Sequence, residues 1–127
     1  LVAHAMNKPF VIARRDARIT EGSVVTINYL SANSSRMRTM SLARRAVSTG
    51  QKALLIDDFI AGGGTVYALC EMMKEFSITV VGCGVAIATR QPEKKQVDSY
   101  KSLFTLEEVD TAQSRISIHP AYSSSSI

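Results

Sequence analysis

ALLIDDFIAGGGT, residues 53–65, combines a short apolar run with two aspartates and three glycines. The four consecutive apolar residues at its start, residues 53–56, are typical of a strand buried on both faces of a parallel sheet. The aspartates follow this strand directly, and the glycines predict a tight loop beyond it. In parallel α/β sheets, ligands bind beyond the carboxyl ends of the strands, so we expect the ligand site here.

The residues after the glycines complete a βαβ unit. Apolar side chains recur at helical spacing over residues 66–76, which predicts an amphipathic helix that ends near Ser77. The apolar stretch at residues 78–89 predicts a second buried strand. The order strand, glycine loop, helix, strand indicates an α/β fold with a right-handed crossover.

Strands are also predicted upstream of this unit. Residues 9–13, PFVIA, predict a strand that begins with proline. Apolar and polar residues alternate over residues 23–30 and again over residues 37–42, with a small, polar stretch at residues 31–36 between them. This pattern predicts two half-exposed strands joined by a mobile loop. Tyr29, next to this loop, either contacts a ligand or ends the strand, and we favour the strand role.

The downstream residues give weaker signals. Spaced apolar residues over 97–104 predict a short helix at one end of the sheet, and residues 116–120, ISIHP, predict an edge strand. We expect one domain over residues 1–120, followed by a frayed, serine-rich tail at residues 121–127.

Composition restricts the class of protein. With 46% apolar residues, no tryptophan and no apolar run of 18 residues, the 127-residue chain is typical of a soluble globular domain. No initiator methionine or signal pattern opens it, so we expect a fragment of a longer, cytoplasmic protein. Cys70 and Cys83 sit among apolar neighbours, which favours buried free thiols over a disulfide or a zinc site.

Positive charge is concentrated in the first half of the chain. Seven arginines fall between residues 14 and 45: Arg14, Arg15, Arg18, Arg36, Arg38, Arg44 and Arg45. Only two acidic residues lie among them. The excess fits either a phosphate-bearing partner, a small molecule or a nucleic acid, or a solvated basic face.

The glycine loop has the chemistry of a phosphate site. Glycines let main-chain N–H groups approach a phosphate, and the amino end of the next helix adds partial positive charge. Thr65 is expected to cap that helix and to bind a phosphate oxygen. The loop lacks the lysine of a nucleotide triphosphate loop, and Tyr67 interrupts the dinucleotide pattern GxGxxG.

Asp57 and Asp58 must meet another part of the ligand, because carboxylates repel phosphate. They suit the hydroxyl groups of a sugar, and can also hold Mg²⁺ directly or through water. A ligand with a phosphate at one end and a diol nearby is a ribose 5-phosphate.

Residues 53–65 are similar to the phosphoribosylpyrophosphate (PRPP) motif of type I phosphoribosyltransferases. Residues 9–19 look like the strand that carries an Arg-Lys pair in that family, with Arg14 and Arg15 in its place. Residues 21–50 and 82–106 resemble, more narrowly, the purine operon repressors of Gram-positive bacteria. The resemblance covers about residues 7–118.

The resemblance implies a type I phosphoribosyltransferase-like parallel sheet flanked by helices, with a hairpin excursion. The implied PRPP-binding residues are Asp57, Asp58, Ala61, Gly62, Gly63, Gly64 and Thr65. The candidate pyrophosphate or loop contacts are Arg14, Arg15, Arg36 and Arg38. No cofactor is required, and Mg²⁺ at Asp57 and Asp58 is the candidate metal.

The repressors also imply a homodimer that binds operator DNA through an amino-terminal winged helix outside this chain and releases it when PRPP accumulates. The first core strand, with its pyrophosphate loop, would likewise lie outside.

Departures from the enzymes favour a sensor without catalytic residues. Gly62 stands where the enzymes usually have threonine or serine, and Ala61 where the repressor can carry lysine. Residues 31–39 match the mobile active-site loop but contain no glutamate or lysine. The alternatives are a purine phosphoribosyltransferase and a phosphate-binding module with a decayed site. The effector is PRPP or another phosphorylated molecule, such as a guanosine polyphosphate.

Overall fold

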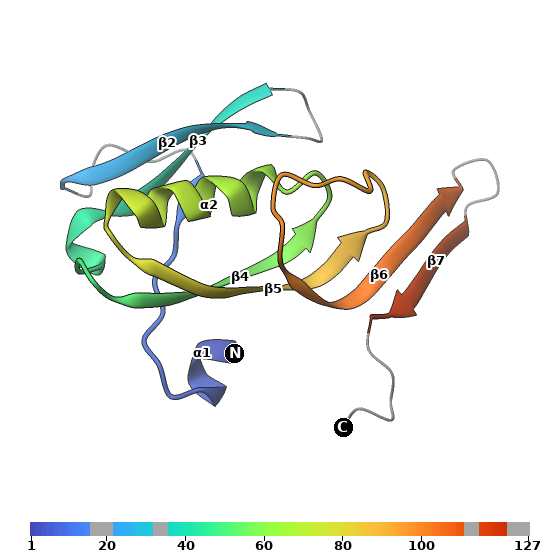
Figure 1. Cartoon of the computed structure of the whole chain (residues 1–127), viewed down its shortest axis with the longest axis horizontal. Helices are drawn as coiled ribbons and strands as arrows, with labels where there is room; N and C mark the ends of the chain where they lie inside the picture. Colours follow the sequence, from blue (N-terminus) through green and yellow to red (C-terminus); the bar gives the residue numbers. More distant parts are fainter. Residues whose placement is uncertain (16–21, 32–35, 111–114, 122–127) are drawn as a thin grey trace.

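The computed structural model describes residues 1–15, 22–31, 36–110 and 115–121. One long helix, α2 (Gly64–Glu75), lies between two β-sheets (Figure 1). A one-turn helix, α1 (Val2–Ala5), lies near the amino end, and a 3₁₀ turn, η1 (Arg44–Ala46), connects the sheets. Among the described residues, no helix is both long and apolar enough to cross a bilayer.

The larger sheet has four strands in the order β4-β5-β6-β7. Their bounds are Lys52–Ile60 for β4, Thr79–Thr89 for β5, Lys101–Asp110 for β6 and Arg115–Pro120 for β7. The pairs β4–β5 and β5–β6 are parallel, whereas β7 is an antiparallel edge strand. The edge strand predicted for residues 116–120 is therefore confirmed.

The predicted βαβ unit is confirmed, because α2 connects the parallel strands β4 and β5. Its boundaries differ in one respect. Gly63, with a φ of 84°, occupies the N-cap position and makes no side-chain cap hydrogen bond. Thr65 lies inside the first helical turn, so the prediction that Thr65 caps the helix is wrong. At the other end, Ser77 adopts a φ of 53° and the helix closes there.

The smaller sheet contains the predicted excursion. β2 (Val24–Ser31) and β3 (Arg36–Ala43) form an antiparallel pair, and β1 (Arg14–Arg15) pairs with the other edge of β3. The loop predicted between β2 and β3 lies outside the described residues at positions 32–35.

Two predicted elements are wrong. Residues 9–13 are not a strand, because only Arg14 and Arg15 reach hydrogen-bonding register with β3. Residues 97–104 are not a helix, because β6 begins at Lys101 and pairs along β5. Pairing with an available strand edge overrides the local pattern there. The expected tail lies outside the described residues from position 122 onward.

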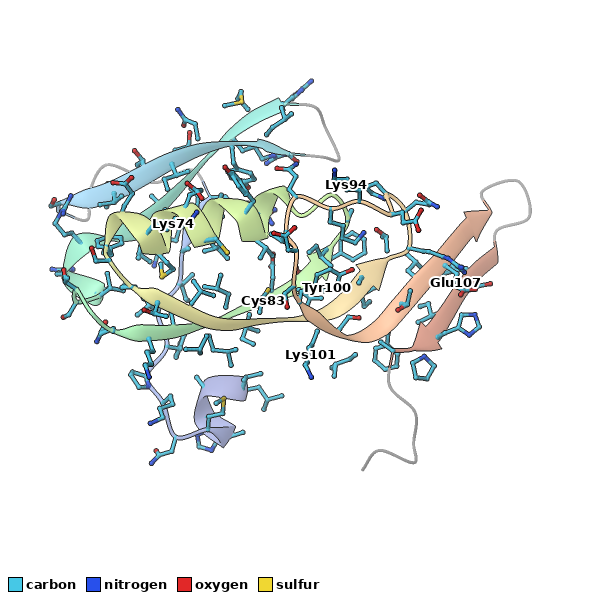
Figure 2. The ribbon with its side chains drawn as sticks, in the orientation of Figure 1. Lys74, Cys83, Lys94, Tyr100, Lys101 and Glu107 are labelled. Atoms are coloured by element: carbon cyan, nitrogen blue, oxygen red, sulfur yellow. The ribbon has the colours of Figure 1, made fainter. Side chains whose placement is uncertain are left out.

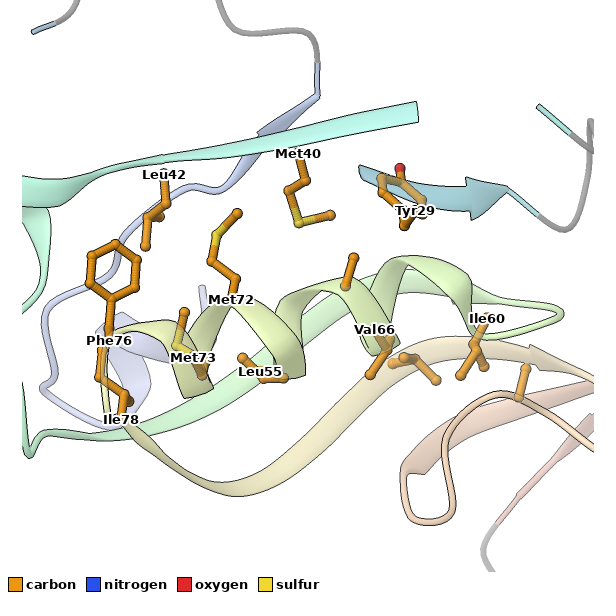
Figure 3. Packing of buried hydrophobic residues seen from close by; sticks show 13 residues of the cluster. Tyr29, Met40, Leu42, Leu55, Ile60, Val66, Met72, Met73, Phe76 and Ile78 are labelled. Atoms are coloured by element: carbon orange, nitrogen blue, oxygen red, sulfur yellow. The ribbon is translucent and has the colours of Figure 1, made fainter. Parts of the chain in front are cut away.

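The core fills both sides of α2 (Figure 3). Met40 and Leu42 of β3 pack against one side of the helix, and Leu55 of β4 lies on the other. Met72 and Val66 of α2 are almost completely buried between the sheets. The helix therefore holds the two sheets in a fixed relation, which positions the loop at its amino end.

The far face of the four-stranded sheet is open. Leu54 is 41% exposed and Ile56 is 49% exposed, so the predicted burial of this strand on both faces is wrong for the described residues. Alternation along β4 explains the result, because Leu55 points toward α2 while its two neighbours point away.

The thiols of Cys70 and Cys83 are free, as predicted, but only partly buried. Burial is the main reason that the pKa of each thiol lies above its usual value, which keeps both thiols protonated near neutral pH. Figure 2 shows the place of Cys83 in β5. They serve as small packing groups between α2 and β5.

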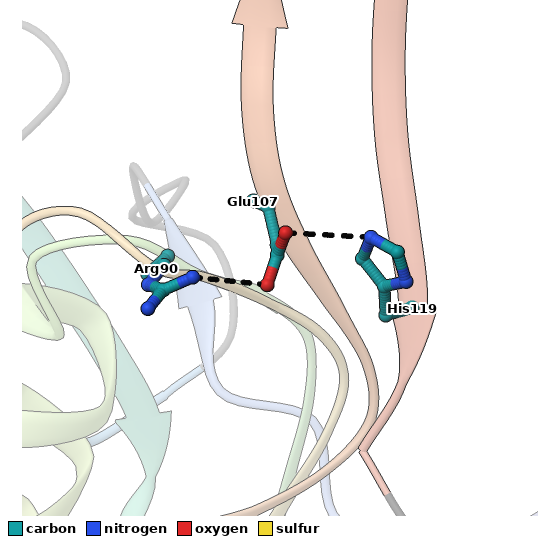
Figure 4. Close-up of polar contacts among 3 residues, drawn as sticks. All are labelled: Arg90, Glu107 and His119. Carbon is teal, nitrogen blue, oxygen red and sulfur yellow. Dashed lines mark hydrogen bonds and ion pairs between the residues drawn. The ribbon is translucent and has the colours of Figure 1, made fainter.

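An exposed group of three polar side chains connects the end of β5 to the β6–β7 hairpin (Figure 4). Arg90 Nη1 lies 3.0 Å from Glu107 Oε1, and His119 Nε2 lies 3.4 Å from Glu107 Oε2. All three side chains are at least 40% exposed, so we expect this group to contribute little to stability.

Candidate functional site

A cleft of about 270 Å³ opens where β4 turns into α2. Three parts of the chain form it: the β4 end with the glycine loop, strand β2, and strand β1. Its lining residues are Arg15, Tyr29, Ser31, Asp58, Phe59, Ile60, Ala61, Gly62, Gly63, Gly64, Thr65 and Val66. The whole predicted loop, Ala61 to Thr65, is therefore in one wall of the cleft.

The glycine loop presents backbone donors to this cleft. The first helical turn of α2 begins at Gly64, and its N–H groups have no acceptor within the helix. Tyr67 N donates the first helical hydrogen bond, to Gly63 O at 2.9 Å. Free N–H groups at a helix amino end, with the helix dipole behind them, favour an anion.

Gly63 has two reasons to be glycine. Its φ of 84° is a left-handed conformation that other residues rarely adopt. A Cβ at this position would also lie 3.3 Å from both Gln96 N and Val97 Cγ2. Since Gln96 N donates to Gly62 O at 2.8 Å, the segment after β5 packs directly against the loop.

The two aspartates differ in their surroundings. Asp58 is exposed and lines the cleft, whereas Asp57 is partly buried and is not among the lining residues. Asp57 Oδ1 accepts the N–H of Asp58 at 3.0 Å, and Oδ2 has no hydrogen-bond partner in the described part of the chain. Asp58 thus lines the cleft itself, whereas Asp57 lies outside the lining but feels the charge of the cleft residue Arg15. A ligand contact at Asp57 stays a prediction.

Burial is the main cause of a raised pKa at Asp57. The hydrogen bond from the Asp58 backbone and the charge of Arg15 oppose this shift, and the negative charge of Asp58 adds to it. A carboxyl that loses solvent without gaining a full set of partners holds its proton to higher pH. Asp57 is therefore a weaker acid than an exposed aspartate.

The structure separates the four predicted arginines. Arg15 lines the cleft, and it lies opposite the buried Met40 in the β1–β3 pair. Arg14 lies opposite Ser41, on the other face of the small sheet, and it has contacts of its own. Arg36 and Arg38 of β3 are outside the lining. Only Arg15 is brought to the glycine loop.

Tyr29 and Ser31 of β2 complete the opposite wall. The sequence interpretation favoured a strand role for Tyr29 over a ligand contact, and it placed Ser31 in the mobile loop. Tyr29 is 4% exposed, and its hydroxyl has no hydrogen-bond partner among the described residues. The alternation over residues 23–30 placed Tyr29 on one face with Val25 and Ile27, and the structure extends this strand to Ser31. The alternation did not show that this face meets α2.

The family model of the phosphoribosyl transferase domain matches residues 1–121. The chain belongs to this family. A fold comparison agrees: adenine phosphoribosyltransferase from Giardia lamblia, solved with 9-deazaadenine, superposes with a TM-score of 0.73. The match covers 84% of this chain and 62% of that chain at 18% identity, so it supports the phosphoribosyltransferase fold alone.

This phosphoribosyl transferase domain is more similar in sequence to transcriptional regulators. It is 42% identical over 116 residues to the purine biosynthesis transcriptional repressor PurR of Bacillus subtilis, covering 91% of this chain and 41% of PurR. It is 36% identical over 117 residues to the purine biosynthesis transcriptional activator PurR of Lactococcus lactis, and this match covers 92% of this chain and 43% of that protein. The chain spans less than half the length of these curated relatives.

The described carboxylates of this phosphoribosyl transferase domain do not form a cluster that could enclose a metal ion. Within residues 1–15, 22–31, 36–110 and 115–121, no three histidine, cysteine, aspartate or glutamate side chains gather in one place. Mg²⁺ commonly keeps several waters and binds through one or two carboxylates plus ligand phosphates. Asp58 in the cleft fits that kind of partial coordination.

Proposed function

We propose that this domain is the PRPP-sensing part of a DNA-binding regulator of purine biosynthesis genes. One observation carries the proposal: a single cleft combines the glycine loop, the Asp58 carboxylate and the Arg15 guanidinium. These groups match, in turn, a 5-phosphate, a ribose diol and a second anionic group. PRPP has all three parts.

Each part of the ligand has its own binding chemistry. The N–H groups at the start of α2 and the Thr65 hydroxyl donate hydrogen bonds to the 5-phosphate. The Asp58 carboxylate accepts hydrogen bonds from ribose hydroxyls, and Arg15 donates to the diphosphate. Mg²⁺ would supply further positive charge to the diphosphate, held by the ligand oxygens with Asp58 as a candidate protein ligand.

The make-up of the cleft supports sensing over turnover. Its described lining contains three side chains that ionise, namely Arg15, Tyr29 and Asp58. Ala61 and Gly62 add no side-chain donor to the phosphate loop. A transferase must also shield the reacting carbon from water and position a base, whereas a sensor needs only differential binding. The two PurR relatives are named as regulators, which supports the same choice.

The regulator binds DNA through a domain outside this chain, and it acts as a homodimer. We propose that it represses its genes and that PRPP binding relieves repression. The named relatives include both a repressor and an activator. The sign of regulation is therefore part of what must be measured.

The test uses the intact protein. We expect PRPP to bind with a measurable heat of titration, to release no pyrophosphate at enzyme-like rates when purine bases are added, and to weaken binding to DNA from upstream of purine biosynthesis genes. Rapid pyrophosphate release with adenine, guanine, xanthine or hypoxanthine would overturn the sensor assignment. A guanosine polyphosphate that bound while PRPP did not would replace the proposed effector.

A purine phosphoribosyltransferase is the second candidate. The fold shared with an adenine phosphoribosyltransferase is the observation that favours it. Because one fold serves many functions, the fold does not by itself decide between the two candidates. PRPP binding without turnover, together with PRPP-sensitive DNA binding, would eliminate the enzyme.

A further inference from the structure

Strand β2 approaches the start of α2 unusually closely at Gly64. A Cβ built on Gly64 would lie 2.4 Å from the carbonyl oxygen of Leu30. That atom belongs to the backbone of β2, so it cannot rotate away as the end of a flexible side chain can. The hairpin can sit at its observed place only because residue 64 has no side chain.

Backbone conformation does not explain this glycine. Gly63 is left-handed, but Gly64 is the first residue of a regular α-helix. Alanine has a higher helix propensity than glycine, by about 1 kcal/mol in helix interiors. An alanine at position 64 would therefore suit the helix and disturb only the approach of β2.

The position of β2 determines one wall of the cleft. Tyr29 and Ser31, on either side of Leu30, line the cleft across from the glycine loop. The loop itself is held from another direction by the hydrogen bond between Gln96 N and Gly62 O. A side chain at position 64 would therefore displace the hairpin more readily than the loop.

Arg15 is connected to the same movement. Arg15 pairs with Met40 of β3, and Met40 pairs with Ile27 of β2, so the three strands form one small sheet. Displacement of β2 would shift the wall residues and Arg15 together. The glycine loop and Asp58 belong to the other side of the cleft, and their positions would not change.

We propose that Gly64 is a positioning residue that seats the β2–β3 hairpin and thereby sets selectivity for ligands with a second anionic group. The inference rests on the proposed function. Ribose 5-phosphate needs the glycine loop and Asp58, whereas PRPP also needs the groups carried by the small sheet. Seating of the hairpin therefore favours PRPP over ribose 5-phosphate.

The test compares two ligands on one variant of the intact protein. Calorimetric titration of Gly64→Ala with PRPP and with ribose 5-phosphate should show that PRPP affinity falls about tenfold more than ribose 5-phosphate affinity, the size expected when charge-assisted contacts are lost. Gly84→Ala is the matched control. Its Cβ would meet Ile56 Cδ1 at 3.2 Å, on a flexible side chain, and both affinities should remain unchanged.

A second variant covers the case in which Gly64→Ala does not fold. Ser31→Ala changes only the wall, and it should also lower PRPP affinity more than ribose 5-phosphate affinity, by about threefold. Equal losses for both ligands, or no loss, would overturn the inference. Failure of the unsubstituted protein to bind either ligand would instead overturn the proposed function, and the inference with it.

Discussion

The backbone N–H of Gln96 donates a 2.8 Å hydrogen bond to the carbonyl oxygen of Gly62, although Gln96 lies beyond β5 and Gly62 precedes α2. Gly62 is buried, so its carbonyl depends on this donor in place of water. The segment after β5 is thus part of the support of the phosphate loop, and the bond can be tested through its donor.

Gln96→Pro removes that N–H. Because a buried acceptor is left without its partner, we expect the free energy of unfolding to fall by about 1–3 kcal/mol, with weaker PRPP binding. Urea unfolding and calorimetry measure the two effects. Gln96→Ala keeps the N–H and should change stability by less than about 0.5 kcal/mol. An equal loss in the alanine variant would mean that the side chain, and not the backbone bond, is important.

Asp58→Asn tests the carboxylate in the cleft. The side chain is exposed, so stability should be nearly unchanged, while loss of a charged acceptor for ribose hydroxyls should lower PRPP affinity about tenfold. Calorimetry with PRPP and with inorganic phosphate separates the two ends of the ligand. Phosphate binding should not weaken, and a parallel loss for both would contradict the assignment of Asp58 to ribose.

Asp57→Asn should have a different effect, on stability. The pKa of Asp57 lies above its ordinary value of 3.8 in the folded chain, mainly because of burial. The folded state then binds more protons than the unfolded state as the pH rises above that value, so the free energy of unfolding falls across this window. The penalty is complete once the pH exceeds the pKa of the folded state.

Asparagine at position 57 cannot ionise and should remove this penalty. We expect the melting temperature without ligand to rise by a few degrees near neutral pH and to change little in acid, where the wild-type carboxyl is protonated. Thermal unfolding of both proteins across acid and neutral pH measures the difference. A variant that is less stable at neutral pH would show that the charged form is stabilised in the native chain.

Arg15→Gln tests which of the adjacent arginines binds the ligand. Arg15 lines the cleft, so its loss should weaken PRPP binding about tenfold at low salt, with a smaller difference at high salt because of screening. Arg14→Gln is the matched control from the opposite face of the same strand, and the PRPP affinity of this variant should equal that of the unsubstituted protein. Equal effects of the two variants in titrations at two salt concentrations would contradict the structural separation.

Local pattern predicted the βαβ unit and the glycine loop well, because their residues are close in sequence. It failed for residues 9–13, which do not pair with β3, and for residues 97–104, where β6 pairs along β5 from Lys101. The same distinction applies to the cleft. Asp58 and residues 61–65 were predicted from one continuous motif, whereas Tyr29 and Ser31 enter through packing of β2 on α2. No periodicity in β2 indicates which partner its buried face meets.

The burial of Leu55 and Asp57 on one face of β4 links the packing of the core to the choice of strand register. Side chains alternate along β4 as far as Asp57, so a slip of the strand by one residue would turn both Leu55 and Asp57 toward the exposed face. The same slip would move the end of the strand, where Asp58 and the glycine loop enter the cleft. One alignment of β4 therefore serves both the core and the ligand site.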